Sequence, residues 1–543
     1  MNFKSLESHQ KLNGCYYTPN WLADFIMRWV LSSSPKTILE PSCGDGVFFD
    51  VLPRAYNGIS ICGFDIDEKA TTACENKLKN IPVQSKIITR DFLQWAIENL
   101  TSENTKTFEA VAGNPPFIRY QYWDKEMQDR AQVFFELMGM KFSKHINAWV
   151  PFLIAAIKFL SAGGHLGMVL PAELLHVLYA KGLREYILQE CSQILITDPE
   201  DIWFEDTLQG AIILMARKKT VASQNTNGIA IIRTSGKSFA EENPSDLFAY
   251  ADYVDGDFLK NKWTYALLTH EERQAYVSLC ANPNVYSFSE LATTDVGIVT
   301  GANKFFLVPD NVVDEYSLQD VAHPMFGRSE HCPGIIYDQE QHMGNVRNGI
   351  STNFLYFDGV EDEVAYKEYL NIGVEQKLTS RYKCRVRTPW YRVPSVYASP
   401  ISMLKRSNGM PRLILNALNA YTTDTAYRIL PAKPIDNASL VVCFLNSLTA
   451  LSAELEGRHY GGGVLELVPS EIDRLKVPYA NISTIDIMEL NSFVKQNSEN
   501  EVVNRQDETV FSQFGADMEQ VKTLQYALSR IKNRRQRIAT SEV

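Results

Sequence analysis

The stretch Ile38-Leu39-Glu40-Pro41-Ser42-Cys43-Gly44-Asp45-Gly46-Val47-Phe48 decides the fold of this chain. It begins as a short apolar strand, passes through a loop of small residues and ends where a helix is expected to begin. Two glycines allow the backbone of such a loop to approach a ligand closely. In open α/β sheets, ligands bind at the carboxyl ends of parallel strands. The stretch therefore predicts a cofactor cleft at the end of a parallel strand.

The residues on both sides of this stretch continue the alternation of strand and helix. Thr18 and Pro19 predict a helix start, with Thr18 as the N-cap and Pro19 at the first helical position. Further helices are expected near 67–78 and 148–160. The strand candidates are Thr37–Leu39, Ile59–Phe64, Ser85–Ile88, Ala110–Ala112, His165–Leu170, Gln193–Thr197 and Gly210–Ala216. This pattern predicts βαβ units and an α/β fold around a mostly parallel sheet.

Composition divides the 543 residues into three segments. The chain turns polar from about Thr220 to Tyr265, so we expect an α/β domain at 1–245 and a mixed α+β domain at 246–480. The second segment is rich in aromatic residues, glycine and proline. Residues 481–543 predict a charged helical tail, whose final arginines form either a solvated helix end or a phosphate contact.

Cysteine usage and hydropathy point to the cytoplasm. The nine cysteines are an odd number and lack metal-ligand spacing, so reduced thiols and no metal site are expected. No segment resembles a signal peptide and no apolar run reaches membrane-spanning length. We therefore expect a cytoplasmic protein that does not bind a membrane.

The net charge of −11 argues against a polyanionic partner, but the charge is unevenly distributed. The stretch 376–412 carries lysines and arginines, no acidic residue, and interleaved tyrosine and tryptophan. A basic, aromatic-rich stretch is a candidate nucleic-acid surface. A solvated face paired with acids elsewhere is the alternative. The candidate DNA-binding residues are Arg381, Lys383, Arg385, Arg387 and Arg392.

Acidic residues stand at the ends of the first three expected strands. Glu40 and Asp45 flank the small-residue loop, where they would repel a pyrophosphate but suit a cationic amino acid. This favours S-adenosylmethionine, which carries an ammonium and a sulfonium and no phosphate. Asp65, followed by Ile66, can take both ribose hydroxyls. Asp91 and Phe92 can accept from an adenine amine and pack near its ring.

The fourth expected strand leads into Asn114-Pro115-Pro116-Phe117. Two prolines fix two φ angles, and the first pushes Asn114 toward an extended conformation. The result is a stiff turn with an amide, bare carbonyls and an aromatic ring, which can hold an exocyclic amine and stack on a base. A rigid loop without catalytic purpose is the alternative. Four strand-end sites in this order favour the catalytic interpretation.

These motifs resemble the gamma-class N6-adenine DNA methyltransferases of the TaqI type, over residues 1–220. The resemblance implies a Rossmann-like class I S-adenosylmethionine-dependent methyltransferase domain. It implies that Asn114, Pro115, Pro116 and Phe117 form the catalytic motif. It also implies that Phe204, with Trp203 as the alternative, packs on the other face of the target base. The implied cofactor-binding residues are Thr18, Glu40, Ser42, Gly44, Asp45, Gly46, Asp65, Ile66, Asp91, Phe92 and Asn114.

The second half resembles the family's target-recognition domain at 296–306, 421–425 and 461–467. The resemblance implies a monomeric, site-specific adenine methyltransferase that acts on double-stranded DNA. Any restriction endonuclease is then expected to be encoded separately, because the cofactor motif begins near residue 17. Methylation of a protein glutamine or of RNA, and a non-catalytic DNA-binding defence module, remain alternatives.

Overall fold

The chain forms two compact units in the computed structural model. The structure describes residues 18–52, 58–79, 81–199, 210–358, 362–460, 462–482 and 486–536. The first unit comprises Met1–Thr269 with Arg537–Val543, and the second comprises His270–Gln536. The first unit carries the expected parallel sheet, and the second is the mixed α+β unit.

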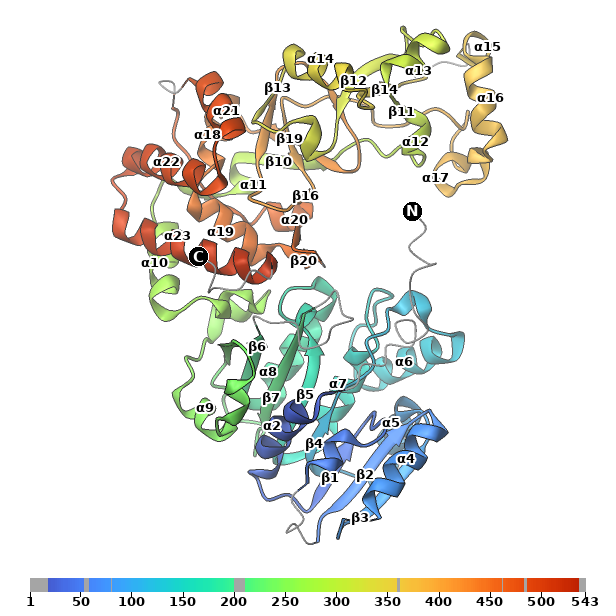
Figure 1. Cartoon of the computed structure of the whole chain (residues 1–543), viewed down its shortest axis with the longest axis vertical. Coiled ribbons are helices and arrows are strands. Elements are labelled where there is room, and N and C mark those ends of the chain that lie inside the picture. Colours follow the sequence, from blue (N-terminus) through green and yellow to red (C-terminus); the bar gives the residue numbers. More distant parts are fainter. Residues whose placement is uncertain are drawn as a thin grey trace. The chain divides into compact units, whose positions relative to one another are not determined.

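The first unit is built on an eight-stranded sheet of order β3-β2-β1-β4-β5-β7-β6-β8 (Figure 1). Strands β1 to β5 run parallel to one another, and β7 runs antiparallel to both β5 and β6. The strands are β1 Thr37–Glu40, β2 Ser60–Asp65, β3 Gln84–Thr89, β4 Phe108–Gly113, β5 Leu160–Pro171, β6 Cys191–Pro199, β7 Ala211–Lys218 and β8 Ile229–Thr234. The expected class I S-adenosylmethionine-dependent methyltransferase fold is confirmed.

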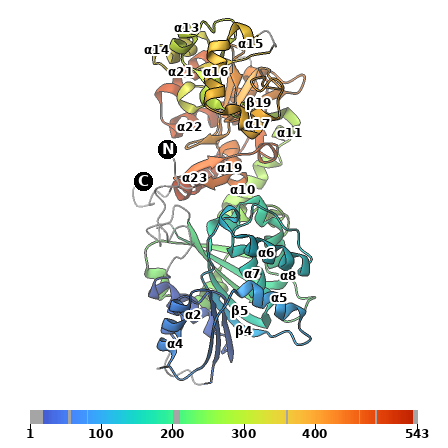
Figure 2. The same cartoon turned by 90° about the vertical axis from the view of Figure 1, so that its right-hand side faces the viewer.

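Helices cover both faces of this sheet. Figure 2 shows α2 and α4 on one face and α5, α7 and α8 on the other. The helices are α2 Asn20–Leu31, α3 Val47–Asp50, α4 Glu68–Leu78, α5 Phe92–Thr101, α6 Lys125–Leu137, α7 Trp149–Lys158, α8 Lys181–Glu190 and α9 Pro244–Tyr250. The apolar residues of α2, among them Leu22, Phe25, Ile26 and Val30, are buried in the core beneath it.

The unit boundary lies later in the chain than the expected position near residue 245. Helix α9 packs on α2, where the ring of Phe248 stacks on that of Trp29 with centroids 4.0 Å apart. Leu247 and Phe248 are therefore part of the first core. The polar stretch in which we expect the boundary also contains β8, which pairs with β6. The contacts divide after Thr269 instead.

The second unit combines short sheets with helices. A five-stranded sheet has the order β10-β19-β15-β17-β13, and a four-stranded sheet the order β11-β14-β12-β18. The strands are β9 Val285–Ser287, β10 Ala292–Val296, β11 Leu307–Val308, β12 Ala322–Phe326, β13 Ile336–Tyr337, β14 Asn353–Leu355, β15 Ile401–Leu404, β16 Arg406–Ser407, β17 Leu413–Asn416, β18 Tyr421–Thr422, β19 Ala426–Pro431, β20 Arg458–Tyr460, β21 Val464–Glu466 and β22 Lys476–Pro478. The longer helices are α10 His270–Cys280, α14 Gln339–Arg347, α16 Lys367–Glu375, α18 Asn437–Phe444, α19 Ser447–Glu456, α21 Ile487–Gln496, α22 Glu499–Phe511 and α23 Met518–Gln536. The shorter helices are α11 Phe288–Leu291, α12 Asn303–Phe306, α13 Asp310–Glu315, α15 Asp362–Ala365, α17 Tyr382–Arg385 and α20 Pro469–Ile472.

The C-terminal helix is an integral part of the second unit rather than a separate tail. Helix α23 packs against α10 and α19. The Arg535 side chain is fully buried and forms an ion pair with the buried Glu454, with Nη2 to Oε1 at 2.7 Å. Arg530 pairs with Glu272. These two arginines are therefore held by acids of their own unit, because α23 lies over the helices that carry those acids.

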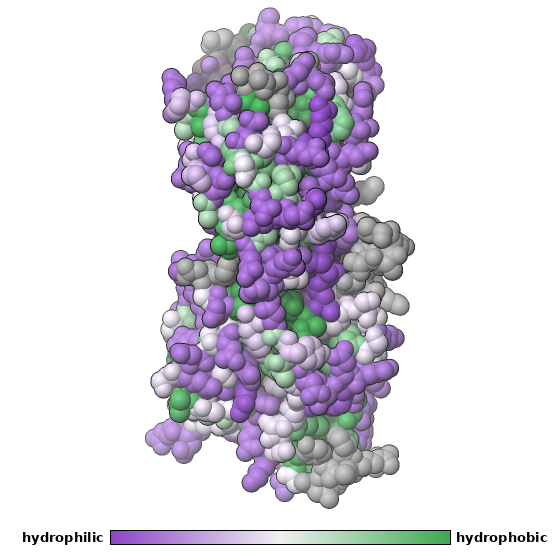
Figure 3. Space-filling model, turned by 90° about the vertical axis from the view of Figure 1, so that its left-hand side faces the viewer, coloured by the Kyte–Doolittle hydropathy of each residue, from purple (hydrophilic) through white to green (hydrophobic). Residues whose placement is uncertain are grey.

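The face of the molecule in Figure 3 is mainly hydrophilic, with apolar side chains in small separate groups. The described cysteines, which are all except Cys15, are free thiols. Among the described residues, no single helix combines the length and apolarity needed to cross a membrane; the bent pair α18 and α19 passes that test jointly, by length and composition alone.

Candidate cofactor and catalytic site

The site lies where the strand order of the first sheet reverses. β1 pairs with β2 on one side and with β4 on the other. The strand order therefore runs from β1 toward β3 on one side and from β4 toward β5 on the other. Ligands of open α/β sheets bind in the crevice outside the carboxyl ends of strands at such a reversal. Glu40 ends β1, Asp65 ends β2 and Gly113 ends β4. The sequence-predicted residues of three separate segments are thus brought to one edge of the sheet.

Asn114 is held by two hydrogen bonds from other segments. Its side-chain amide donates to the Thr18 hydroxyl at 3.1 Å. The Ser42 hydroxyl donates to the Asn114 backbone carbonyl at 3.0 Å. Thr18 does not cap α2 as expected: Pro19 is the N-cap residue, and the Thr18 hydroxyl faces Asn114 instead. The N-terminal segment thus holds the side-chain amide of Asn114, and the first loop holds its backbone carbonyl.

The loop after β1 is shaped by its glycines and fastened to the end of β2. Gly44 and Gly46 have φ angles of 52° and 87°, in the left-handed region. A Cβ atom at Gly46 would lie 2.7 Å from the Cys74 Sγ, so α4 packs directly on the loop. The Gly44 N–H donates to Asp65 Oδ2 at 2.9 Å. Because a carboxylate offers about four acceptor positions, Asp65 can still accept from two further hydroxyls.

Glu40 is the carboxylate of this edge that best fits a cationic ligand. It is 1% exposed, and its Oε2 has no hydrogen-bond partner among the described residues. Burial, followed by the neighbouring Cys74, Asp65 and Asp45, raises the pKa of Glu40 well above its ordinary value. An unpartnered buried carboxylate is costly unless a positive group reaches it. An ammonium group is a positive group of this kind.

Asp45 has a different environment from the one expected. Its Oδ2 accepts from Lys77 Nζ on α4 at 3.0 Å, and the same Nζ lies 2.8 Å from Asp50 Oδ2. A lysine between two carboxylates neutralises much of their charge. The charge of Asp45 is therefore more fully compensated than that of Glu40, whose Oε2 has no partner among the described residues.

Asp91 and Phe92 are also engaged by the protein. Asp91 Oδ1 accepts from the backbone N–H groups of Leu93 and Gln94, which caps α5, and its Oδ2 lies 3.3 Å from Arg130 Nε. The ring of Phe92 is buried, with its centroid 5.5 Å from that of Phe64. Ile66, by contrast, is 77% exposed at the end of β2. Ile66 is the apolar side chain that this edge offers to a planar ring.

The proline turn after β4 is rigid and partly buried. Pro115 is buried, whereas Pro116 and Phe117 are half-buried. The Phe117 ring packs against the core that contains α2. Trp203 and Phe204, expected on the opposite face of a target base, lie outside the described residues. The stacking role of Phe204 therefore stays a prediction.

Sequence reasoning missed a carboxyl group at the end of the neighbouring strand. Glu173 follows β5, which pairs with β4, and the Tyr179 hydroxyl donates to its Oε2 at 2.6 Å. Burial raises the pKa of Glu173, while the Tyr179 hydroxyl and the charge of Arg119 act in the opposite direction. Its position two residues after Pro171, at a strand end, was the signal in the sequence.

The predicted DNA-binding residues lie in the second unit and differ in their surroundings. Arg381, Lys383 and Arg385 are exposed on or beside α17. Arg392 is exposed, and its Nη2 lies 3.3 Å from Asp358 Oδ1. Arg387 is half-buried and donates to the carbonyl oxygens of the loop that follows β10. Four of the five predicted DNA-binding residues are therefore exposed, and the fifth, Arg387, has a structural role.

Known proteins match both halves of the chain. Residues 4–248 match the family described as N-6 DNA Methylase, and residues 260–511 match the C-terminal domain of Type II methyltransferase M.Eco57I. Type II methyltransferase M.AccI from Acinetobacter calcoaceticus is 22% identical over 487 residues, which is 87% of this chain and 86% of that protein. M.BanIII from Aneurinibacillus aneurinilyticus is 22% identical over 498 residues, covering 79% of this chain and 82% of that one.

Solved structures of restriction-modification enzymes are also similar. The type IIG restriction endonuclease BpuSI covers 96% of this chain with a TM-score of 0.41 and 14% identity, and this chain spans 66% of it. The DrdV–DNA complex covers 85% of this chain with a TM-score of 0.48 and 11% identity, and this chain spans 56% of that one. Residues 4–248 are thus similar to the N-6 DNA Methylase family and residues 260–511 to the C-terminal domain of Type II methyltransferase M.Eco57I, and together these matches support a DNA methyltransferase.

Proposed function

We propose that the chain transfers a methyl group from S-adenosylmethionine to N6 of an adenine flipped out of duplex DNA, at a specific sequence. The position of Asn114 carries this proposal. Its amide stands directly after β4 at the reversal of the sheet, oriented by Thr18 and Ser42. An amide that donates its NH₂ group to Thr18 is oriented with its carbonyl oxygen as the acceptor for an incoming amine.

The cofactor is proposed to lie across the ends of β1, β2 and β3. S-adenosylmethionine, when bound, supplies an electrophilic methyl group on a sulfonium. Glu40 would take its ammonium, Asp65 its ribose hydroxyls, and Ile66 the face of its adenine. Ser42, Gly44 and Gly46 keep the loop close to the ligand. Thr18 and Asp91 complete the set as neighbours of Asn114 and of the adenine.

Asn114 and Pro115 are proposed to activate the target amine by hydrogen bonding. The lone pair of an adenine amine is delocalised into the ring. If the Asn114 side-chain oxygen and the Pro115 carbonyl accept both N–H bonds, the nitrogen becomes more tetrahedral and its lone pair points outward. This stabilisation grows toward the transition state, so it accelerates the reaction rather than only tightening binding. Pro115 and Pro116 keep the two acceptors fixed in advance.

The target base must leave the duplex to reach this turn. Unstacking costs a few kcal/mol, and each aromatic face that stacks on the base returns about 1–3 kcal/mol. Phe117 is proposed for one face and Phe204 for the other. The second unit is proposed to bind double-stranded DNA through its basic surface. We further propose a cytoplasmic monomer that acts as the modification enzyme beside a separately encoded endonuclease.

Methylation mapping tests this proposal. The chain is expressed in a host without DNA methylation, and genomic DNA is examined by mass spectrometry and methylation-sensitive sequencing. Wild type is expected to give N6-methyladenine at one sequence motif. Asn114→Ala is expected to give no N6-methyladenine while still binding S-adenosylmethionine in calorimetry. The matched control is Asn104→Ala, in an exposed loop of the same unit, which is expected to methylate like wild type. N4-methylcytosine, or methylation by Asn114→Ala at the wild-type level, contradicts the proposal.

A further inference from the structure

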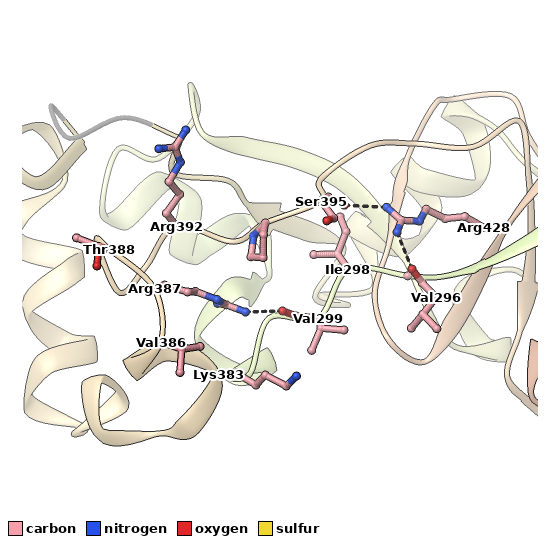
Figure 4. A pocket seen from close by; sticks show the side chains of 12 residues that line it. Val296, Ile298, Val299, Lys383, Val386, Arg387, Thr388, Arg392, Ser395 and Arg428 are labelled. Carbon is pink, nitrogen blue, oxygen red and sulfur yellow. Dashed lines mark hydrogen bonds between the residues drawn. The ribbon is translucent and has the colours of Figure 1, made fainter.

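The second unit contains a basic pocket between the loop after β10 and the chain that follows α17. Its volume is about 600 Å³. Its lining includes the cationic side chains of Lys383, Arg387, Arg392 and Arg428, and no carboxylate is among the residues that line it. Figure 4 shows Arg387 between Lys383 and Arg392, with Arg428 on the far side of the loop. We call these surroundings the basic pocket.

Two of the four cations build the wall of the basic pocket. Arg387 donates to the Val299 carbonyl at 2.7 Å and to the Thr300 carbonyl at 2.8 Å. Arg428 donates to the Val296 carbonyl at 2.6 Å and to the Ser395 carbonyl at 2.8 Å. Figure 4 shows both guanidinium groups directed at the loop. Each arginine therefore fixes backbone that lines the pocket.

The charge of this wall is not neutralised by a direct ion pair. In the described parts of the chain, the ion pairs of 4.0 Å or less include none from Arg387 or Arg428 to a carboxylate. Burial lowers the pKa of both guanidinium groups, although Tyr397 and Asp295 partly oppose this for Arg428 and Cys384 for Arg387. Carbonyl oxygens accept from the Nη donors of both groups, whereas Arg428 Nε has no hydrogen-bond partner among the described residues, and the net charge stays in place. A buried or half-buried guanidinium group without a direct ion pair is the electrostatic environment that an anion relieves.

The other two cations are placed to touch a ligand. Lys383 is exposed on α17, and Arg392 is 54% exposed. Lys383 is held close to the loop: a Cβ atom at Gly301 would lie 2.6 Å from the Lys383 Cβ, and the φ of Gly301 is 78°. Arg392 faces the exposed Asp358 at 3.3 Å. An exposed pair of this kind is weak and can exchange for a stronger anion.

We propose that the basic pocket holds a length of DNA phosphodiester backbone, with Lys383 and Arg392 contacting phosphates and Arg387 and Arg428 forming the charged wall behind them. This inference rests on the proposed function, since it takes duplex DNA as the ligand. The cations lie on two sides of Arg387 rather than converging on one point, which suits successive phosphates better than a single small anion (Figure 4). Arg387 is thereby assigned to the wall and not to direct DNA contact. In this proposal the carboxylate of Asp358 competes with the DNA phosphates for Arg392.

Salt-dependent DNA binding by the full chain tests the assignment. Fluorescence anisotropy is measured with a random-sequence duplex and with a duplex that carries the methylated sequence. Lys383→Gln and Arg392→Gln are each expected to weaken the binding of both duplexes by the same factor. Each is also expected to reduce the magnitude of the slope of log K against log salt by about 0.9. Asp358→Asn is expected to tighten binding of both duplexes. A gain of affinity cannot arise from a folding defect.

Matched controls come from the same unit. Arg328→Gln removes an exposed arginine that also faces an acid, Glu330, at 3.3 Å, and Lys522→Gln removes an exposed lysine of α23. Both are expected to leave the salt slope unchanged. Arg387→Gln is expected to lower the unfolding temperature, because two backbone carbonyls lose their donor.

Three results would overturn the assignment. They are an unchanged slope for Lys383→Gln and Arg392→Gln, a loss confined to the duplex with the methylated sequence, and weaker binding by Asp358→Asn. The proposed function fails in a different way. Wild type would then leave genomic adenine unmethylated, whatever the pocket variants do to duplex affinity.

Discussion

The side-chain amide of Asn114 donates a hydrogen bond to the hydroxyl of Thr18 at 3.1 Å, across a sequence separation of 96 residues. Thr18 immediately precedes Pro19 and α2, whereas Asn114 follows β4. Helix α2 packs on β4, so the segment that carries Thr18 reaches the turn that carries Asn114. The proposed catalytic amide is therefore positioned by a residue outside its own motif.

Replacing Thr18 by valine tests this positioning. Thr18→Val keeps the shape of the side chain but removes the acceptor for the Asn114 amide. One hydrogen bond is worth about 1 kcal/mol, so we expect kcat for DNA methylation to fall roughly fivefold. The measurement is single-turnover methylation at saturating cofactor and DNA, which separates the effect on kcat from weaker binding.

Thr18→Ser is the control, because it retains the hydroxyl. Its rate is expected to stay within about twofold of wild type, since the hydrogen bond is kept. Equal rates for Thr18→Val and wild type would show that the hydrogen bond to Asn114 does not position the amide during the reaction.

Glu40→Gln should separate cofactor affinity from stability. Glu40 has a raised pKa in the folded protein, so its contribution to stability is complete below its unfolded pKa and is lost as the pH rises through the folded pKa. The glutamine variant is therefore expected to gain unfolding temperature over wild type at pH 8 and to lose this advantage near pH 4. Loss of a charged hydrogen bond of about 1.5–3 kcal/mol should weaken S-adenosylmethionine binding roughly ten- to a hundredfold.

Calorimetry of cofactor binding checks the same group directly. A cation beside Glu40 lowers its pKa, so binding to wild type is expected to release protons and to strengthen as the pH rises through the folded pKa of Glu40. Both effects should vanish in Glu40→Gln. Asp45→Asn is the control, because Lys77 already pairs with Asp45. Proton release that persists in Glu40→Gln would assign it to another group.

Local pattern was sufficient to locate most of the first sheet but not its last strand. The seven strands expected from apolar runs correspond to β1 to β7. The eighth, Ile229–Thr234, is a short apolar run inside the polar stretch, and that stretch predicts a domain boundary rather than a strand. It is a strand because Ile229 and the residues after it pair with β6 from Ile194 onward. Such pairing between distant segments has no signal within a local window.

In the candidate site, too, local sequence identified the residues, whereas their partners depend on contacts between distant segments. Strand ends and small residues identified Glu40, Asp65 and Asn114. The pairing of Asp45 with Lys77 and of Asp91 with Arg130 depends on which helices pack over the strand ends. For Asp91 a local signal did exist, because aspartate directly before a helix is a preferred N-cap. Arg428 of the basic pocket lies on β19, away from the basic stretch, and only the fold brings it there.

Alanine at Gly46 and at Gly44 should have unequal effects. Both glycines have positive φ, so alanine costs about 1–2 kcal/mol of backbone strain at either position. A Cβ at Gly44 meets no atom within 4 Å, whereas one at Gly46 would lie 2.7 Å from Cys74 Sγ. We expect Gly46→Ala to destabilise the protein more than Gly44→Ala in urea unfolding. The combination Gly46→Ala with Cys74→Ala should recover part of the difference.

Equal losses for the two alanine variants would contradict the direct packing of α4 on the loop. Cofactor affinity adds a second measurement. Gly46→Ala should weaken S-adenosylmethionine binding along with stability, because the displaced loop carries the residues next to Glu40.

Breaking the Arg535–Glu454 pair should destabilise the second unit strongly. Both side chains are buried, with Arg535 Nε to Glu454 Oε2 at 2.9 Å, and Arg535 also donates to the carbonyls of Asn408 and Gly463. Arg535→Met leaves an uncompensated buried carboxylate, which costs about 3–5 kcal/mol. Replacing both partners, as Arg535→Met with Glu454→Met, should recover much of the loss, since apolar side chains can replace a buried pair.

A double-mutant cycle by urea unfolding measures this coupling. Lys522→Met with Glu519→Met, an exposed pair on the same helix, is the control and is expected to show a coupling of less than about 1 kcal/mol. If Arg535→Met alone cost no more than the exposed control, α23 would be dispensable to the second unit. The arginines at its end would then be free to serve as the phosphate contact that the sequence suggested.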